Sequence, residues 1–207
     1  MGANNGSPIT EQQLEEYAEL TYLSKPEIIF ILQRLLNLDE TKHFSTIKRY
    51  PEQAVVELFP QLKVRHLRCL ALRCRKTIPR FAPSQHNPFR DRLLYVFSSE
   101  RDDNFSFEDL LDLFSVLSDK CPLQVKATWA FRLYDFDNDN LITKEDIMML
   151  CDRLTKEEQL GQQEKQNIAD LLLQEMDLQN NGNLAVFDFV HAISKMPEFQ
   201  HTFSCRL

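Results

Sequence analysis

The chain has 207 residues and a formal net charge of −7, with 43% hydrophobic and 27% charged residues, which suits one or two domains with a substantial core. Only four residues are glycine, which excludes the glycine-rich phosphate loops of common nucleotide enzymes and the nucleophile elbow of α/β-hydrolases. Because all-β folds use glycine in tight turns, this scarcity favours an all-α chain. The longest apolar run, Ile28 to Leu32, is too short to span a membrane.

Charge and cysteine usage indicate an intracellular, cytoplasmic protein. The five cysteines form no C-x-x-C pair, which is typical of reduced thiols, and the scattered histidines give no support for a zinc site. The first 24 residues contain four glutamates and no lysine or arginine, so they do not resemble a signal peptide. Between Leu58 and Arg90 there are eight basic residues and no acidic one, so an acidic protein carries one basic segment.

Capping boxes predict where three helices begin. Thr10 with Gln13, Ser24 with Glu27, and Thr155 with Glu158 each fit the pattern in which a hydroxyl and a side chain three residues later cap a helix start. Each pair precedes a run of apolar residues with helical spacing.

The segment from Gln85 to Arg206 repeats one plan three times: an amphipathic helix, a polar window of twelve residues, and another amphipathic helix. The windows begin at Ser98, Asp135 and Asp177, and each has an apolar residue in its eighth place: Phe105, Ile142 and Leu184. Helix–loop–helix units of this kind, called hands, pack in pairs, and a short β contact joins the two loops of a pair at the eighth position. We therefore expect Ile142 to pair with Leu184, and Phe105 to pair with a hand between Lys25 and Leu62.

The window from Asp135 has the ligand pattern of an EF-hand, because hard cations need six or more oxygens and alternate residues of a twelve-residue loop supply them. The predicted ligands are Asp135, Asp137, Asp139, the Leu141 carbonyl, Thr143 and Asp146. Asn140 replaces the usual glycine of the turn and tolerates a left-handed backbone. Asp146 is shorter than the usual glutamate, which favours Mg²⁺, so we expect a site for Mg²⁺ and Ca²⁺.

The other two windows are weaker. The window from Asp177 offers Asp177, Gln179, Asn181, the Asn183 carbonyl and Asp188, so only two carboxylates remain and whether it binds an ion stays open. The window from Ser98 begins with a hydroxyl, has no glycine at its turn, and is expected not to bind a metal ion.

Several segments together resemble the calcium- and integrin-binding (calmyrin) family of EF-hand proteins. They are Leu14–Leu23, Asn87–Arg90, Phe105–Val116, Ala130–Asp135 and Pro197–Phe203, and the resemblance covers most of the chain except roughly residues 64–85. It implies an all-α, two-lobed EF-hand protein of the calmodulin-like superfamily. Residues 1–24 would form the N-terminal segment and first helix, 25–118 the N-terminal lobe with two degenerate hands and the basic insertion at about 64–85, and 119–196 the C-terminal lobe with the third and fourth hands.

The resemblance also implies a function. A hydrophobic groove would bind an amphipathic helix from a membrane protein, such as an integrin α cytoplasmic tail or a channel segment, and the C-terminal segment 197–207 would plug that groove with Phe199 and Phe203 until displaced. Metal at the third hand would gate access. The alternative is a regulatory subunit of an enzyme, in the manner of calcineurin B. No nucleophile and base constellation appears, so the chain is not expected to be an enzyme.

Membrane association is a further expectation. Gly2 is placed for myristoylation, but Gly6 stands where serine or threonine is preferred, which leaves the modification open. A single acyl chain anchors weakly, and the basic amphipathic insertion at 64–85 is a candidate second signal, or else only a solvated insertion. Together they would place the protein at the inner face of the plasma membrane. Nothing supports binding to nucleic acid.

Overall fold

The computed structural model describes residues 8–38, 45–63, 88–155, 160–196, 198–205 and 207. The described part is mostly helical, as the composition predicts, with one two-stranded sheet. The chain divides into two units: residues up to Lys63 with Leu94–Cys121 and Cys205–Leu207 form unit 1, and Val64–Leu93 with Pro122–Ser204 form unit 2. In the described residues, no helix is long and apolar enough to cross a bilayer.

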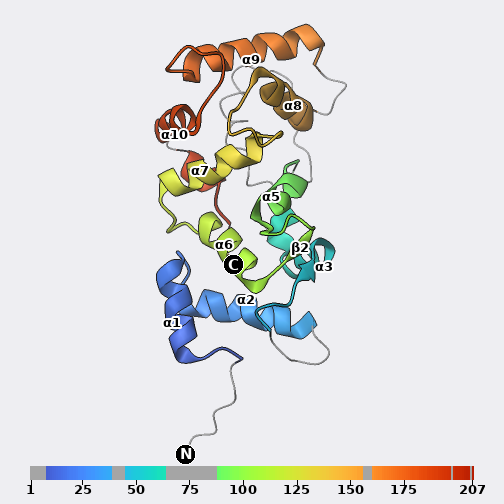
Figure 1. Ribbon diagram of the computed structural model, residues 1–207, viewed down its shortest axis with the longest axis vertical. Helices are drawn as coiled ribbons and strands as arrows, with labels where there is room; N and C mark the ends of the chain where they lie inside the picture. Colours follow the sequence, from blue (N-terminus) through green and yellow to red (C-terminus); the bar gives the residue numbers. More distant parts are fainter. Residues whose placement is uncertain (1–7, 39–44, 64–87, 156–159, 197, 206) are drawn as a thin grey trace, which may run out of the picture. The chain divides into compact units, whose positions relative to one another are not determined.

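Unit 1 contains the helices α1 (Glu11–Leu20), α2 (Lys25–Leu38), α3 (Glu52–Leu58) and α6 (Phe107–Leu117), the 3₁₀ helix η1 (Pro60–Lys63), and the C-terminal half of α5 (Arg90–Phe97). Helix α2 packs against both α1 and α6 (Figure 1). The rings of Phe59 and Phe114 lie 4.8 Å apart at the centre of the core, together with the fully buried Phe105 and Phe107. An aromatic core therefore fixes the second hand.

Two short strands join the hands of unit 1. Strand β1 (Tyr50–Pro51) pairs antiparallel with β2 (Asn104–Phe105), with Tyr50 opposite Phe105. The Glu52 N–H extends this ladder by donating to the Asp103 carbonyl at 2.9 Å. The predicted upstream partner of Phe105 is thus confirmed, and it is Tyr50. Because of this pairing, Arg49, the residue just before β1, lies next to the loop that begins at Ser98.

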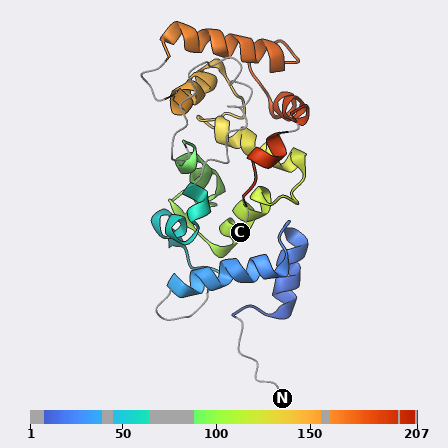
Figure 2. The same cartoon turned by 180° about the vertical axis from the view of Figure 1, so that it is seen from behind.

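Unit 2 contains the helices α7 (Leu123–Tyr134), α8 (Lys144–Thr155), α9 (Gln162–Met176), α10 (Val186–Ser194) and the short α11 (Phe199–Thr202), with the start of α5. Helix α7 packs against α10, and α8 against α9 (Figure 2). Ile142 and Leu184 exchange two backbone hydrogen bonds of 2.9 Å, which confirms the predicted pairing of the third and fourth hands.

Two of the three predicted helix starts are confirmed. Thr10 and Gln13 form a reciprocal capping box at α1, and Glu27 accepts the Ser24 N–H at 2.7 Å just before α2. The third prediction is wrong: Thr155 is the last residue of α8, where its hydroxyl donates to the Cys151 carbonyl at 2.8 Å, and Glu158 lies outside the described residues. Helix α9 begins instead after Gly161, whose N–H donates to Glu164.

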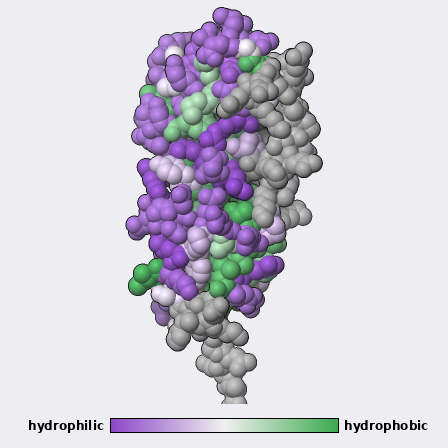
Figure 3. Space-filling view, turned by 90° about the vertical axis from the view of Figure 1, so that its right-hand side faces the viewer, coloured by the Kyte–Doolittle hydropathy of each residue, from purple (hydrophilic) through white to green (hydrophobic). Residues whose placement is uncertain are grey.

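The described surface is largely hydrophilic. On the face shown in Figure 3, purple residues predominate and the green hydrophobic residues form smaller groups. Exposed large apolar side chains are few, and the most exposed are Ile47, Leu20 and Phe187.

Candidate metal centre

Three twelve-residue loops share one backbone turn. In each, the fourth and sixth residues have positive φ angles, which define the left-handed region. These residues are Arg101 (53°) and Asp103 (58°) in the second loop, Asn138 (60°) and Asn140 (67°) in the third, and Asn180 (54°) and Gly182 (85°) in the fourth. Asparagine and glycine adopt this conformation readily, whereas arginine does so at a cost. All three loops thus have the turn of a cation-binding loop, whatever their ligands.

The third loop brings three carboxylates together. One oxygen from each of Asp135, Asp137 and Asp139 lies within 4.8 Å of the other two, and Asp135 is buried. Burial raises the pKa of Asp135, against backbone N–H groups that favour its charged form: those of Asp139 and Asn140 donate to its two oxygens at 3.2 and 3.1 Å. Three crowded carboxylates repel one another, and a bound cation would relieve that repulsion.

The remaining predicted ligands of this loop lie at its other end. The buried Asp146 accepts the Phe136 N–H at 3.0 Å on one oxygen, and the N–H and hydroxyl of Thr143 at 2.9 and 2.7 Å on the other. Leu141 donates its N–H to Asp139 at 2.8 Å. Asp146 does not join the group of three carboxylates. The donor set consists only of carboxylate, hydroxyl and carbonyl oxygens, which fits Ca²⁺ or Mg²⁺.

Two arginines hold the third loop from outside. The Arg92 guanidinium donates to the carbonyl of Asp135 and, at 2.7 Å, to the side chain of Asn138. Arg92 and Arg153 both lie near the Phe136 ring, at 5.8 and 5.0 Å from its centroid. Arg153 also makes two bonds of 2.8 and 2.9 Å to Asp91. The start of α5 is therefore tied to the first half of the loop.

The fourth loop has the same internal hydrogen bonds with fewer charges. Asp177 accepts the N–H groups of Gln179 at 3.1 Å and Gly182 at 2.7 Å, and Asn181 accepts the Asn183 N–H at 3.3 Å. Asp188, fully buried at the twelfth position, accepts the Ala185 N–H with one oxygen only.

The other oxygen of Asp188 is buried and has no hydrogen-bond partner. An unpartnered buried carboxylate oxygen is costly, and a cation at this loop would provide the missing partner. This loop also fits a hard cation, although its two carboxylates would neutralise less charge than the four of the third loop.

An arginine enters the second loop where the ligand oxygens of an EF-hand loop would surround a cation. Arg49 directly precedes β1, and its guanidinium donates to the Ser98 hydroxyl (3.3 Å), the Ser99 hydroxyl (3.0 Å), the Asp102 carboxylate (2.8 Å) and the Asn104 carbonyl (2.8 Å). It also lies 3.6 Å from Asp109. These groups include loop positions one, five, seven and twelve. Hydrogen bonding by Arg49 is the first cause that holds the pKa of Asp102 down at about 2.

Sequence reasoning missed Arg49 and Arg92. Both lie more than 40 residues along the chain from the loop residues that they contact, and charge patterning alone does not identify such pairs. One signal was available for Arg49: it immediately precedes the residue that pairs with Phe105, and β pairing of Tyr50 with Phe105 carries its neighbour to the loop.

The predicted C-terminal residues come together in unit 2. Phe199 and Phe203 are completely buried, and their rings stack with centroids 5.6 Å apart and planes at 9°. Behind them, the fully buried Lys126 of α7 donates to the Phe203 carbonyl at 2.9 Å and to the Ser204 hydroxyl at 2.5 Å. Gly2 and the basic insertion at 64–85 lie outside the described residues.

Comparisons with known proteins agree with this architecture. A family model for the EF-hand domain pair matches residues 124–194, which contain the third and fourth loops. The chain is 32% identical to human calcium and integrin-binding family member 2 over 211 aligned residues, covering 99% of both chains. It is 33% identical to the Drosophila melanogaster protein of that name, covering 96% of both chains, and 34% identical to the Danio rerio protein, covering 99% of both. At this identity over the whole length, the chain belongs to the calcium and integrin-binding family of EF-hand proteins.

Proposed function

We propose that this protein is a non-enzymatic adaptor that binds Ca²⁺ or Mg²⁺ and captures an amphipathic helix from the cytoplasmic segment of a membrane protein. The name of its relatives supports calcium and integrin binding as the starting point. The observation that carries the proposal is the C-terminal segment, because it is itself a short helix that buries two aromatic side chains four residues apart.

The third loop is the proposed principal metal site. Asp135, Asp137, Asp139, Thr143 and Asp146 would hold the ion through side-chain oxygens, and Leu141 through its carbonyl. When bound, the ion neutralises the crowded carboxylates and ties the two ends of the loop together. The fourth loop, through Asp177, Gln179, Asn181, Asn183 and Asp188, is proposed as a weaker second site.

The surface under α11 is the proposed binding site for a target helix. Phe199 and Phe203 are themselves fully buried there, and burying a phenylalanine is worth roughly 1.5–3 kcal/mol. Helix α11 has only four residues, too few to be stable alone, so packing holds it in place. A longer amphipathic helix with apolar residues at the same spacing could therefore take its place.

Lys126 strengthens the hold on this segment. Its ammonium is completely buried and bonds to both Phe203 and Ser204, and hydrogen bonds from a charged group are worth about 1.5–3 kcal/mol. Release of the segment would remove these two acceptors from a buried charge. We infer that the C-terminal segment competes with a target helix rather than binding alongside it.

Binding of a labelled peptide tests the proposal directly. The full-length chain is titrated into a fluorescent peptide from an integrin α cytoplasmic tail, with Mg²⁺, with Ca²⁺ and with chelator. Replacing Phe199 and Phe203 by alanine removes the competitor and is expected to tighten binding roughly tenfold, because truncated side chains no longer occupy the surface. Phe187→Ala is the matched control, since that ring is 69% exposed on α10.

Gating by the third loop predicts that chelator weakens peptide binding and that Asp135→Ala does the same in the presence of metal. The proposal fails if the double variant at Phe199 and Phe203 does not bind the integrin peptide more tightly than the Phe187→Ala control does. Fractionation of cells that express the wild type or Gly2→Ala tests the proposed location at the inner face of the plasma membrane, with a shift to the soluble fraction expected for the variant.

A further inference from the structure

The second loop shares the backbone of the third and fourth loops but departs from their residue pattern. Its backbone has the same turn as the third and fourth loops, with left-handed residues at positions four and six. Its first residue is Ser98, so it lacks the carboxylate that begins the other two loops. Arg101 and Asp103 adopt the left-handed conformation, and arginine has no local side-chain compensation for its cost. A loop with this backbone and these residues needs something else to hold it.

The internal hydrogen bonds of the second loop also match those of the third. At the twelfth position, Asp109 accepts the Ser99 N–H at 3.2 Å and the Ser106 N–H at 2.9 Å, as Asp146 does for the second and ninth residues of its loop. At the fifth position, Asp102 accepts the Asn104 N–H at 3.1 Å, as Asp139 does for Leu141. The oxygens of the second loop are therefore oriented as in a metal-binding loop.

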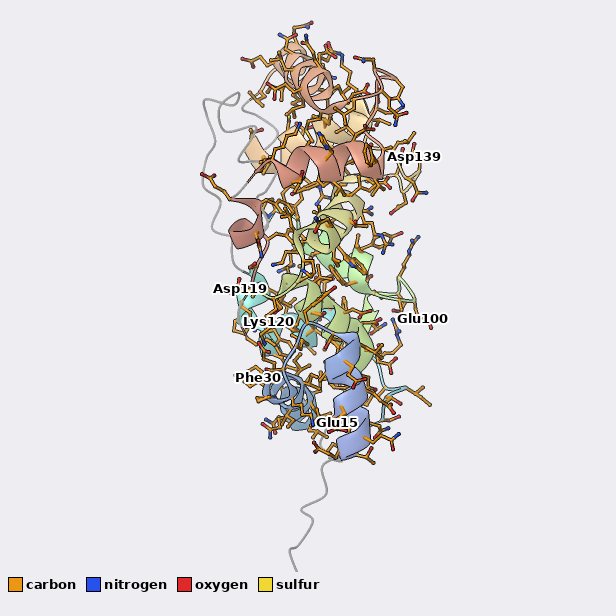
Figure 4. The ribbon with its side chains drawn as sticks, turned by 90° about the vertical axis from the view of Figure 1, so that its left-hand side faces the viewer. Glu15, Phe30, Glu100, Asp119, Lys120 and Asp139 are labelled. Carbon is orange, nitrogen blue, oxygen red and sulfur yellow. The ribbon has the colours of Figure 1, made fainter. Side chains whose placement is uncertain are left out.

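What these oxygens face is the guanidinium of Arg49. It contacts the hydroxyl at position one, the carboxylate at position five and the carbonyl at position seven, and lies 3.6 Å from the carboxylate at position twelve. A fourth bond reaches Ser99. The guanidinium carries one positive charge and five N–H donors, so it can satisfy several oxygens around a centre. Glu100, at position three, is exposed and lies at the outer edge of its loop (Figure 4).

We propose that the guanidinium of Arg49 is the permanent cation of the second loop, so that this hand keeps its shape without metal and excludes divalent ions. The positive charge is covalently tethered next to β1, and it lies opposite the loop whenever Tyr50 pairs with Phe105. A divalent ion would have to displace the guanidinium from its hydrogen bonds and repel it. The second hand is consequently insensitive to chelators.

Hydrogen exchange of the full-length chain, read by mass spectrometry for residues 98–109, tests both halves of the proposal. The first comparison is wild type with chelator against wild type with Mg²⁺ or Ca²⁺. Exchange in 98–109 is expected to stay within about twofold, while exchange in 135–146 slows by more than roughly tenfold on adding the ion. The proposal would be overturned if the ion slowed hydrogen exchange in residues 98–109 and still did so in the double variant Asp135→Ala, Asp177→Ala.

The second comparison removes the guanidinium. Arg49→Gln is expected to accelerate exchange in 98–109 by roughly tenfold or more, since several hydrogen bonds from a charged group are lost. Lys48→Gln is the matched control: it removes the neighbouring positive charge, whose ammonium lies 5.6 Å from the centroid of the Tyr50 ring, and should leave 98–109 unchanged. Equal exchange in the two variants would overturn the proposal.

Should Arg49→Gln fail to fold, Arg49→Lys provides the same test. Lysine keeps the charge but cannot bridge as many oxygens, so an acceleration smaller than that expected for glutamine supports the proposal, and wild-type exchange contradicts it. No target peptide enters these measurements, so their outcome is independent of the adaptor function proposed above.

Discussion

The loops Ser98–Asp109 and Asp135–Asp146 place the same two positions in the left-handed region and use the carboxylate at position twelve for the same backbone bonds. They differ in the charge at their centre. The third loop gathers three carboxylates. In the second loop an arginine from outside the loop bonds to two serine hydroxyls and the Asp102 carboxylate, and lies 3.6 Å from the Asp109 carboxylate. The turn of an EF-hand can thus be kept while the positive charge opposite its oxygens comes from the chain itself in place of an ion from solvent.

The largest expected effect separates the two loops by their need for metal. Asp135→Ala removes the buried first carboxylate, so the chain should lose the stabilisation that an ion provides, which is about 2.7 kcal/mol at an ion concentration of about 100 times Kd. Thermal melting with and without Mg²⁺ measures this difference. Ser98→Ala, the equivalent change in the second loop, should leave the metal-dependent part of the melting shift unchanged. An equal loss in both variants would contradict the comparison.

The length of the twelfth side chain should matter in the third loop and not in the second. Asp146→Glu gives the third loop the reach for bidentate Ca²⁺ coordination, so Ca²⁺ affinity should rise roughly tenfold, or about 1.4 kcal/mol, while Mg²⁺ affinity does not rise. Isothermal titration measures both affinities. Asp109→Glu makes the same change in the second loop. Because Arg49 remains there, this variant should gain no ion binding beyond that of the wild type. Calcium binding gained by Asp109→Glu alone would count against a resident guanidinium.

A smaller change in the free energy of unfolding is expected from the left-handed residues of the turn that the loops share. Arg101→Asn places in the second loop the residue type that the third loop has at the same position, so the free energy of unfolding should rise by about 0.5–1 kcal/mol. Gly182→Ala in the fourth loop should lower it by about 1 kcal/mol through backbone conformation alone, because no heavy atom lies within 4 Å of the added carbon. Urea denaturation measures both changes in the free energy of unfolding. A decrease for Arg101→Asn and an increase for Gly182→Ala would show that the turn is not strained.

The most local effect is a titration. Hydrogen bonding to Arg49 holds the pKa of Asp102 at about 2, below the ordinary 3.8, so this interaction stabilises the fold above about pH 4 and is lost as the pH falls toward 2. NMR of the side-chain carboxyl carbon should show the midpoint of Asp102 moving back toward 3.8 in Arg49→Gln, with no such movement in Lys48→Gln. A midpoint that stays near 2 would mean that backbone donors, not Arg49, dominate.

Local patterns predicted most of the fold, because helix caps, apolar spacing and alternating oxygens act over a few residues. The eighth-position pairings of Ile142 with Leu184 and of Phe105 with an upstream hand followed from the repeat and are confirmed. Thr155 failed as a helix start because its hydroxyl could also bond back to the preceding turn, and sequence does not distinguish these two uses. Arg49, Arg92 and Lys126 were not predicted, since their roles depend on contacts across more than 40 residues.

The buried ammonium of Lys126 gives the C-terminal surface a polarity. Among its acceptors are the Phe203 carbonyl and the Ser204 hydroxyl, just beyond the end of α11. A helix has unpaired carbonyl groups at its C-terminal end and none at its N-terminal end. An incoming helix would therefore have to arrive with its C-terminal end over Lys126, since the reverse orientation would bring N–H groups against a positive charge. In the proposed complex, Lys126 would thus favour one direction of the bound helix through the carbonyl groups at that helix's C-terminal end.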